Sequence, residues 1–255
     1  MTERESAVRL EGKRAIVTGA ASGFGAGIAH KFVAEGARIL VADINAEGAK
    51  AMAESLGPNA ASCVVDVSDD GSVAAMAQHA AEAFGNIDIM VNNAGIGHLP
   101  QPLEDIPEDE FDRVFAVNAK SVYLTARHVV PRMKAAGGGV ILNMASTAGV
   151  SPRPRLTWYN ASKGWMITAT RSMAVELAQA KIRVNALNPV AGETPRLKTF
   201  MGEDTPEVRA RFIATIPLGR FSTPEDLGNA ACFLCSDEAS MITGVALEVD
   251  GGRCV

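Results

Sequence analysis

Residues 15–25 read Ala-Ile-Val-Thr-Gly-Ala-Ala-Ser-Gly-Phe-Gly, an apolar run followed by a glycine-rich turn. Gly19, Gly23 and Gly25 allow tight turning and close backbone approach, and a helix that starts here offers unpaired N–H groups to a phosphate. The spacing is Gly-x-x-x-Gly-x-Gly rather than the commoner Gly-x-Gly-x-x-Gly. Because the turn follows a strand pattern and opens a helix pattern, it predicts a dinucleotide site in a Rossmann-type α/β fold.

Strand-like apolar runs alternate with helical patterns along the whole chain. We expect strands near residues 15–17, 38–42, 62–65, 87–91, 139–143, 183–187 and 245–249. We expect helices near residues 24–36, 45–57, 68–84, 118–136, 157–180 and 224–236, and another from residue 107. Nearly continuous apolar strands separated by helices are typical of a parallel sheet that is covered on both faces.

No linker, repeat or low-complexity segment interrupts this alternation, so we predict one doubly wound domain over residues 1–255. Residues 1–10 are expected to be a frayed lead-in. Residues 189–218 are rich in Gly, Pro and Thr. We expect them to form a long irregular substrate-binding loop, because long loops in compact domains usually bind ligands or cover sites.

The composition argues against several other classes. The net charge is −5 and no block of Lys and Arg occurs, which disfavours a nucleic-acid partner. No apolar run of about 18 residues occurs and the N-terminus is polar, so neither a membrane span nor a secretion signal is expected, and the cytoplasm is the expected location. Cys232 and Cys235 form a Cys-x-x-Cys, which could be a redox pair, half of a zinc site, or two core residues of a helix. Because the sequence has no second such pair and no histidine cluster, we expect the core role and no metal.

Asp43 ends the second expected strand, where the adenosine ribose of a dinucleotide lies in this fold. A carboxylate there accepts hydrogen bonds from both ribose hydroxyls and repels a 2′-phosphate. Ile44 and Asn45 bring no positive charge, and Ser22 in the glycine turn is uncharged. NAD is therefore favoured over NADP. The alternative is that Asp43 only caps the following helix.

Residues 159–163 read Tyr-Asn-Ala-Ser-Lys, which places a phenol and an ammonium about one helical turn apart on one face. A cation beside a tyrosine stabilises the phenolate and lowers a pKa that is normally about 10. Such a tyrosine exchanges a proton with an alcohol or a carbonyl. Together with a dinucleotide site, this pair indicates hydride transfer at an alcohol or ketone carbon.

With these motifs the chain resembles the classical short-chain dehydrogenase/reductases from about Gly12 to Gly252. The resemblance rests on Thr18–Gly25, Asp66-Val67, Asn92-Asn93-Ala94-Gly95, Asn118, Ser146 and Tyr159–Lys163. It implies a seven-stranded parallel sheet with three helices on each face, and a homotetramer or dimer. Within the family, the chain looks most similar to sulfobenzyl-alcohol dehydrogenase-like and 3-oxoacyl-[acyl-carrier-protein] reductase-like members.

The resemblance also implies a role for each motif residue. Tyr159 would be the general acid/base, Lys163 would lower its pKa and hold the nicotinamide ribose, and Ser146 would hydrogen-bond the substrate oxygen. Asn118 would anchor a water in a proton relay. NAD would be bound by Gly19, Ser22, Gly23, Phe24, Gly25, Asp43, Ile44, Asp66, Val67, Asn92, Ala94, Gly95, Tyr159, Lys163, Pro189, Gly192 and Thr194.

The segment after the sixth expected strand departs from the family's pattern. The family usually reads Pro-Gly there, whereas residues 188–195 read Asn-Pro-Val-Ala-Gly-Glu-Thr-Pro. Val190 stands where glycine is usual, so the backbone near the nicotinamide is expected to take a different path.

The substrate pocket is expected to include His98, Arg153, Arg155 and Phe200, with Ile96, Ala148 and Met201 as further candidates. Trp158 is expected to face packing contacts or a subunit interface rather than the chemistry. Arg153 and Arg155 precede the catalytic tyrosine in a loop. They either clamp a carboxylate, sulfonate or phosphate, or they are solvated loop charges.

We therefore predict an NAD(H)-dependent oxidoreductase that interconverts a secondary or aromatic primary alcohol and its carbonyl compound. The alternatives are a 3-oxoacyl-[acyl-carrier-protein] reductase, against which Asp43 and the acidic balance argue, and a sugar 1-dehydrogenase. An epimerase or dehydratase acting on a nucleotide sugar is a further alternative, which is disfavoured because such enzymes usually carry a larger C-terminal domain. A non-catalytic dinucleotide-binding sensor is disfavoured by the intact set Asn118, Ser146, Tyr159 and Lys163.

Overall fold

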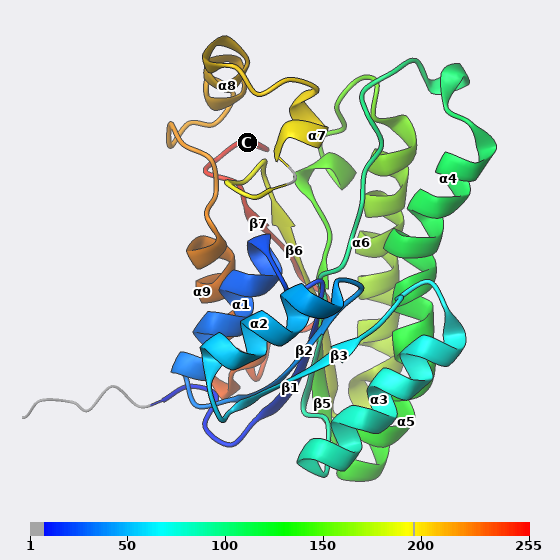
Figure 1. The fold of residues 1–255 in the computed structure, drawn as a ribbon, viewed down its shortest axis with the longest axis vertical. Helices are drawn as coiled ribbons and strands as arrows, with labels where there is room; N and C mark the ends of the chain where they lie inside the picture. Colours follow the sequence, from blue (N-terminus) through cyan, green and yellow to red (C-terminus); the bar gives the residue numbers. More distant parts are fainter. Residues whose placement is uncertain (1–7, 196) are drawn as a thin grey trace, which may run out of the picture.

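Seven parallel strands form one twisted sheet at the centre of the computed structural model, which describes residues 8–195 and 197–255 (Figure 1). The order across the sheet is β3-β2-β1-β4-β5-β6-β7. The strands are β1 Arg14–Thr18, β2 Arg38–Asp43, β3 Ala60–Val64, β4 Ile89–Asn92, β5 Gly139–Met144, β6 Ile182–Pro189 and β7 Ala246–Val249. The order reverses between β1 and β4, and such a switch point is where ligands bind in open α/β sheets.

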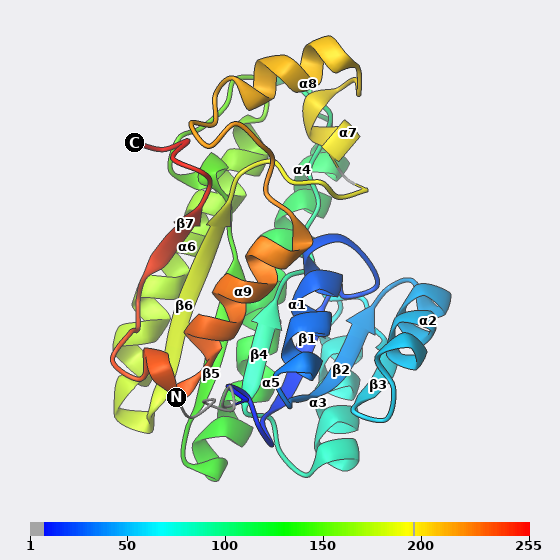
Figure 2. The same cartoon turned by 90° about the vertical axis from the view of Figure 1, so that its left-hand side faces the viewer.

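Helices cover both faces of the sheet (Figure 2). One layer contains α1 Gly23–Ala34, α2 Ala46–Leu56 and α9 Pro224–Cys235, and the other contains α3 Asp70–Phe84, α5 Ser121–Ala136 and α6 Thr157–Leu177. α4 Glu108–Phe115 packs against α6. The predicted fold class, a doubly wound parallel sheet with three helices on each face, is confirmed.

Alternation along the central strands explains why both layers form. In β1, Ala15 and Val17 face the layer of α1, α2 and α9, whereas Ile16 faces α3 and α5. The neighbouring β2 divides in the same way, with Val41 on the first side and Leu40 on the second. Because successive side chains point to opposite faces, a strand that is apolar throughout needs a cover on each. Cys232 and Cys235 are buried in the first layer, as expected for core residues.

Two expectations differ from the structure. The segment 189–218, expected to be irregular, contains α7 Leu197–Met201 and α8 Pro206–Ile213. The Thr205 side chain accepts a hydrogen bond from Val208 N at the start of α8, which is a capping signal that the sequence already carried. Of the expected frayed lead-in, residues 1–7 lie outside the described residues, whereas Leu10 is fully buried and donates its N–H to Glu35 O over 2.9 Å.

No helix within the described residues is both long and apolar enough to cross a membrane.

Candidate active site

The glycine turn lies against the turn that follows β4. Gly19 has φ +63°, and a Cβ there would lie 2.9 Å from Ala94 Cα. A Cβ at Gly25 would overlap Gly19 O and lie 2.5 Å from Asn93 Nδ2. Only glycine fits at either position, because the short approach excludes a side chain at both, and at Gly19 the left-handed φ does so as well. The backbone of the turn is therefore open to a ligand from the edge of the sheet.

Asn93 holds the two turns together, a role that the sequence analysis did not assign to it. Its Nδ2 donates to Thr18 O over 2.8 Å and to Gly19 O over 3.1 Å, while Asn93 N and Ala94 N both donate to Thr18 Oγ1 over 3.1 Å. The sequence offered one signal for this role: Thr18 ends a buried strand, and a buried hydroxyl there needs hydrogen-bond partners from a neighbouring segment.

Asn92, expected to line the cofactor, directs its side chain into the core. Its Nδ2 donates to Asn143 Oδ1 over 2.8 Å, and its Oδ1 accepts from Thr125 Oγ1 over 2.8 Å. Asn143 Nδ2 continues the chain to Thr170 Oγ1 over 2.9 Å. This buried network links β4 and β5 to α5 and α6, the helices next to the candidate catalytic residues.

The N-terminus of α1 fits an anionic group. Its N-cap residue Ser22 makes no side-chain cap hydrogen bond, and no acidic residue lies in the first turn. By contrast, α2 and α3 are capped by the side chains of Asn45 and Asp69. The first N–H groups of α1 therefore stay available, and the helix dipole favours negative charge there. Together with the cradle formed by the glycines, this fits the pyrophosphate of a dinucleotide.

Asp43 lies at the carboxyl end of β2 beside the glycine turn. Its Oδ2 accepts from Ala21 N over 3.0 Å, and its Oδ1 accepts from Asn45 N over 3.0 Å. The N-cap of α2 is Asn45, whose side chain accepts from Gly48 N, so Asp43 is not the helix cap. Its carboxylate remains half-exposed at the edge of the sheet, with the exposed Ile44 next to it.

Asp66 lies at the same edge, after β3. Its Oδ1 accepts from Ser68 Oγ over 2.6 Å and from Ser68 N over 2.9 Å, and these bonds lower the pKa of the Asp66 carboxyl. The neighbouring Val67 is buried.

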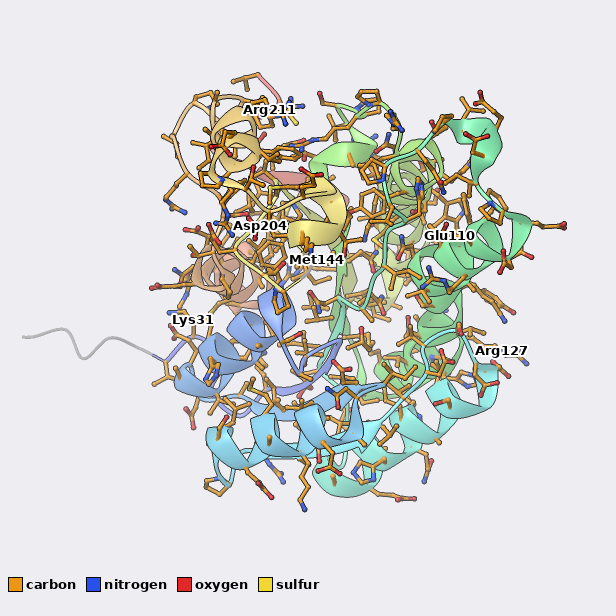
Figure 3. The ribbon with its side chains drawn as sticks, turned by 45° about the horizontal axis from the view of Figure 1, so that its top comes forward. Lys31, Glu110, Arg127, Met144, Asp204 and Arg211 are labelled. Atoms are coloured by element: carbon orange, nitrogen blue, oxygen red, sulfur yellow. The ribbon has the colours of Figure 1, made fainter. Side chains whose placement is uncertain are left out.

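Tyr159 and Lys163 lie one turn apart on the buried face of α6. Lys163 is 4% exposed and donates from Nζ to Met144 O over 2.7 Å. Met144 lies near the middle of the molecule in Figure 3. Nζ is 5.9 Å from the centroid of the Tyr159 ring. Burial lowers the pKa of the Lys163 ammonium to about 8. An ammonium that is short of solvent gains more than an exposed one from a developing phenolate beside it.

Asn118 joins the turn after β4 to α6. It lies in a π-helical turn, Ala116–Lys120, an irregularity that often marks functional sites. Its Oδ1 accepts from Ile96 N over 2.8 Å, and its Nδ2 donates to Ile96 O over 2.8 Å and to Ser162 Oγ over 3.0 Å. A Cβ at Gly95 would lie 3.3 Å from both Asn118 Oδ1 and Lys163 Nζ, so the two polar groups meet at Gly95.

One cavity brings several of the candidate reactive side chains together. It is lined by Ser146, Tyr159, Arg153 and Phe200, among others. Ser146 Oγ accepts from Ala148 N over 3.0 Å, which leaves its own proton free to be donated. The Tyr159 ring lies 5.1 Å from the Phe200 ring, centroid to centroid.

Other expected pocket residues lie elsewhere. Arg155 is exposed with φ +66°, and its carbonyl accepts from Gln101 N; it does not line the cavity. His98 is buried, with Nδ1 2.9 Å from Leu99 O, and is also outside the lining. Trp158 packs edge-on against Phe111, in line with the expectation that it faces away from the chemistry.

The segment after β6 meets the glycine turn despite its unusual sequence. Val190 is buried and pairs with Val249 through its N–H. A Cβ at Gly192 would overlap the Phe24 ring, so this glycine is needed two positions later than the family's usual one. The Thr194 side chain lies 3.4 Å from the place of a Cβ at Gly23. Pro189, Gly192 and Thr194 all line the cavity, which puts this segment where the cofactor and substrate would meet.

Comparisons with known proteins agree with this fold. A family model described as enoyl-(acyl carrier protein) reductase matches residues 19–253. The chain is 50% identical over 250 residues to the 4-formylbenzenesulfonate dehydrogenase of Comamonas testosteroni, covering 96% of this chain and 99% of the relative. A crystal structure of a 3-ketoacyl-(acyl-carrier-protein) reductase from Brucella melitensis with NADH matches with a TM-score of 0.93 and 50% identity, covering 96% and 100%. A 7α-hydroxysteroid dehydrogenase with NADH and 7-oxo glycochenodeoxycholic acid matches with a TM-score of 0.91 and 38% identity, covering 98% of both chains.

Proposed function

This chain belongs to the classical short-chain dehydrogenase/reductase family, and we propose that it interconverts an aromatic primary or a secondary alcohol and the corresponding carbonyl compound. It is an oxidoreductase that acts on CH–OH groups with NAD(H), as the family membership and the NADH-bound neighbours indicate. One observation carries the proposal: four candidate catalytic side chains come together in the folded chain. Tyr159 and Ser146 line the cavity, and Lys163 and Asn118 meet at Gly95.

NAD, when bound, accepts a hydride from the alcohol carbon or returns one to the carbonyl carbon. In the oxidative direction, Tyr159 would take the hydroxyl proton of the substrate. Lys163 would favour the negatively charged phenolate that accepts this proton, and Ser146 would donate a hydrogen bond to the substrate oxygen as its charge changes. Asn118, held by Ile96 and Ser162, would fix the polar end of the site where a relay water binds.

The cofactor preference gives a direct test. We expect Asp43→Ala to lower the ratio of kcat/KM with NAD to kcat/KM with NADP by about 10- to 100-fold, because it removes ribose hydrogen bonds and the repulsion of a 2′-phosphate. Steady-state kinetics with both cofactors measures the ratio. Glu47→Ala, which removes an exposed carboxylate from the first turn of α2, is the matched control. If the ratio were unchanged in Asp43→Ala, Asp43 would not be the residue that sets the preference for NAD.

The reaction class is tested by NADH formation at alkaline pH with several alcohols. The panel contains benzyl alcohol, acidic benzyl alcohols, a secondary alcohol, a 3-hydroxyacyl thioester and glucose. Turnover of the benzyl or secondary alcohols supports the proposal. Turnover restricted to the thioester or to glucose would replace the proposed substrate class while keeping the assigned catalytic residues. NADH binding without turnover on any member would count against the proposed reaction.

A 3-oxoacyl-[acyl-carrier-protein] reductase is the second candidate, favoured by the neighbour of that name at 50% identity. Two features speak against it. Asp43 opposes the NADP(H) that such reductases generally use, and the net charge of −5 disfavours docking of an acidic carrier protein.

We also propose that the chain forms a homotetramer or a dimer. α5 and α6 expose large apolar side chains, with Tyr123 55%, Trp165 41% and Val175 81% exposed. An exposed apolar surface of this kind is typical of a subunit contact. Light scattering of the purified protein measures the mass, and a monomer at micromolar concentration would contradict this proposal.

A further inference from the structure

Arg153 places a positive charge in the cavity wall without a balancing carboxylate. It lines the cavity together with Tyr159, and no ion pair within the described residues includes it. Burial is the main cause that lowers the pKa of its guanidinium. A half-buried cation without a partner is unfavourable in the empty protein, and an anionic ligand would relieve that cost.

The conformation of Arg153 leaves its donors available. The guanidinium carbon Cζ lies 4.5 Å from the centroid of the Phe212 ring of α8. Its backbone carbonyl accepts from Asn160 Nδ2 over 2.7 Å, directly beside Tyr159 in the chain. No hydrogen bond among the described residues uses the Arg153 guanidinium, so its N–H groups remain available for a pair of parallel hydrogen bonds.

A second cation, Arg253, adds to the positive potential around Arg153. Arg253, from the segment after β7, repels the Arg153 guanidinium and so contributes to the lowering of its pKa. Arg253 Nη1 donates to Ser151 Oγ over 3.4 Å, whereas its buried Nε has no hydrogen-bond partner. Cys254 does not supply the missing negative charge, because burial raises the pKa of its thiol to about 11. In Figure 2 the carboxyl terminus lies at the same end of the molecule as α7 and α8.

We propose that Arg153, supported by Arg253, binds an anionic oxygen group of the substrate, such as a sulfonate or a carboxylate, and thereby selects acidic aromatic alcohols. The inference rests on the proposed function, since it concerns the same cavity. A planar aromatic ring would lie between Phe200 and the Arg153 guanidinium, with its alcohol carbon toward Tyr159 and its acidic group toward the arginine.

The test compares 4-(hydroxymethyl)benzenesulfonate with the uncharged 4-(hydroxymethyl)benzenesulfonamide, two alcohols of similar shape. We expect the wild type to prefer the sulfonate by at least about 10-fold in kcat/KM, and Arg153→Met to abolish most of that preference, as expected when a charge-assisted bidentate contact is removed. Methionine keeps an apolar contact with Phe212. Arg253→Met should lower the preference by a smaller factor of about 3 to 10, because its charge acts at longer range.

Arg211→Met is the matched control. Arg211 is exposed on α8, at the outer rim of the molecule in Figure 3, so its loss should leave the preference unchanged. A wild type that treats both alcohols equally, or an Arg153→Met variant that loses activity on both to the same extent, would overturn the proposal.

A binding measurement separates this inference from the reaction itself. Benzenesulfonate and benzenesulfonamide are titrated into the enzyme–NADH complex, with NADH fluorescence as the readout. Tighter binding of benzenesulfonate that disappears in Arg153→Met supports the anion site even if neither alcohol is turned over, in which case only the proposed reaction fails. Equal binding of the two compounds would contradict the anion site.

Discussion

Tyr159→Phe is expected to lower kcat by about 10³- to 10⁴-fold, the usual contribution of a general acid/base, while NADH still binds. The phenol is buried at the cavity beside Ser146, and the substitution removes only its hydroxyl. Phenylalanine keeps the ring that packs on Phe200, so the pocket should keep its shape. Steady-state kinetics gives the loss of turnover, and NADH fluorescence gives the binding constant.

The other tyrosine of the chain provides the control. Tyr123 lies on α5 in the exposed apolar surface proposed above as a subunit contact, and it does not line the cavity. Tyr123→Phe keeps the apolar ring of that surface and removes only the hydroxyl, so kcat should stay within about twofold of the wild type. If Tyr159→Phe kept more than a tenth of the wild-type kcat, Tyr159 would not be the acid/base. If it lost NADH binding as well, the loss of turnover would reflect a disturbed pocket instead.

Lys163→Met is expected to abolish turnover and at the same time to stabilise the protein without its cofactor. Burial lowers the pKa of Lys163 from the ordinary 10.5 to about 8, so the folded protein holds a charge at pH 7 that it disfavours. A shift of this size corresponds to about 3 kcal/mol. The bond that Lys163 makes to Met144 O offsets part of it. We therefore expect the free energy of unfolding at pH 7 to rise by about 2 kcal/mol, measured by urea denaturation.

The pH dependence distinguishes this cause from a simple packing gain. Below pH 8 the ammonium is charged in both the folded and the unfolded state, and the whole penalty is present. Between pH 8 and 10.5 the unfolded state binds the proton and the folded state does not, so wild-type stability rises with pH. The advantage of Lys163→Met should accordingly shrink over this range. Lys134→Met, at an exposed position on α5, should show neither effect. If the stability gain of Lys163→Met stayed constant from pH 7 to 10, the lowered pKa of Lys163 would not be its cause.

Much of the fold could be predicted because its signals are local. The strands β1, β2 and β5 coincide with apolar runs, and α9 begins at Pro224, where the predicted helix near residues 224–236 was expected to begin. The π-helical turn at Ala116–Lys120 and the short helix α7 were not predicted, because neither has a pattern of its own. Both depend on contacts with distant segments, such as the bonds of Asn118 to Ile96 and Ser162.

The sequence by itself determined the doubly wound sheet, the glycine turn and the Tyr159–Lys163 pair, because strand alternation, glycine conformation and helical spacing act between near neighbours in the chain. Only the tertiary structure separated Arg153 from Arg155, two residues apart in one loop: the first contacts the Phe212 ring of α8 and lines the cavity, while the second is exposed. It also turned Asn92 toward the core and brought Asn93 onto the glycine turn. These outcomes depend on packing and hydrogen bonds between segments far apart in sequence, which no local pattern records.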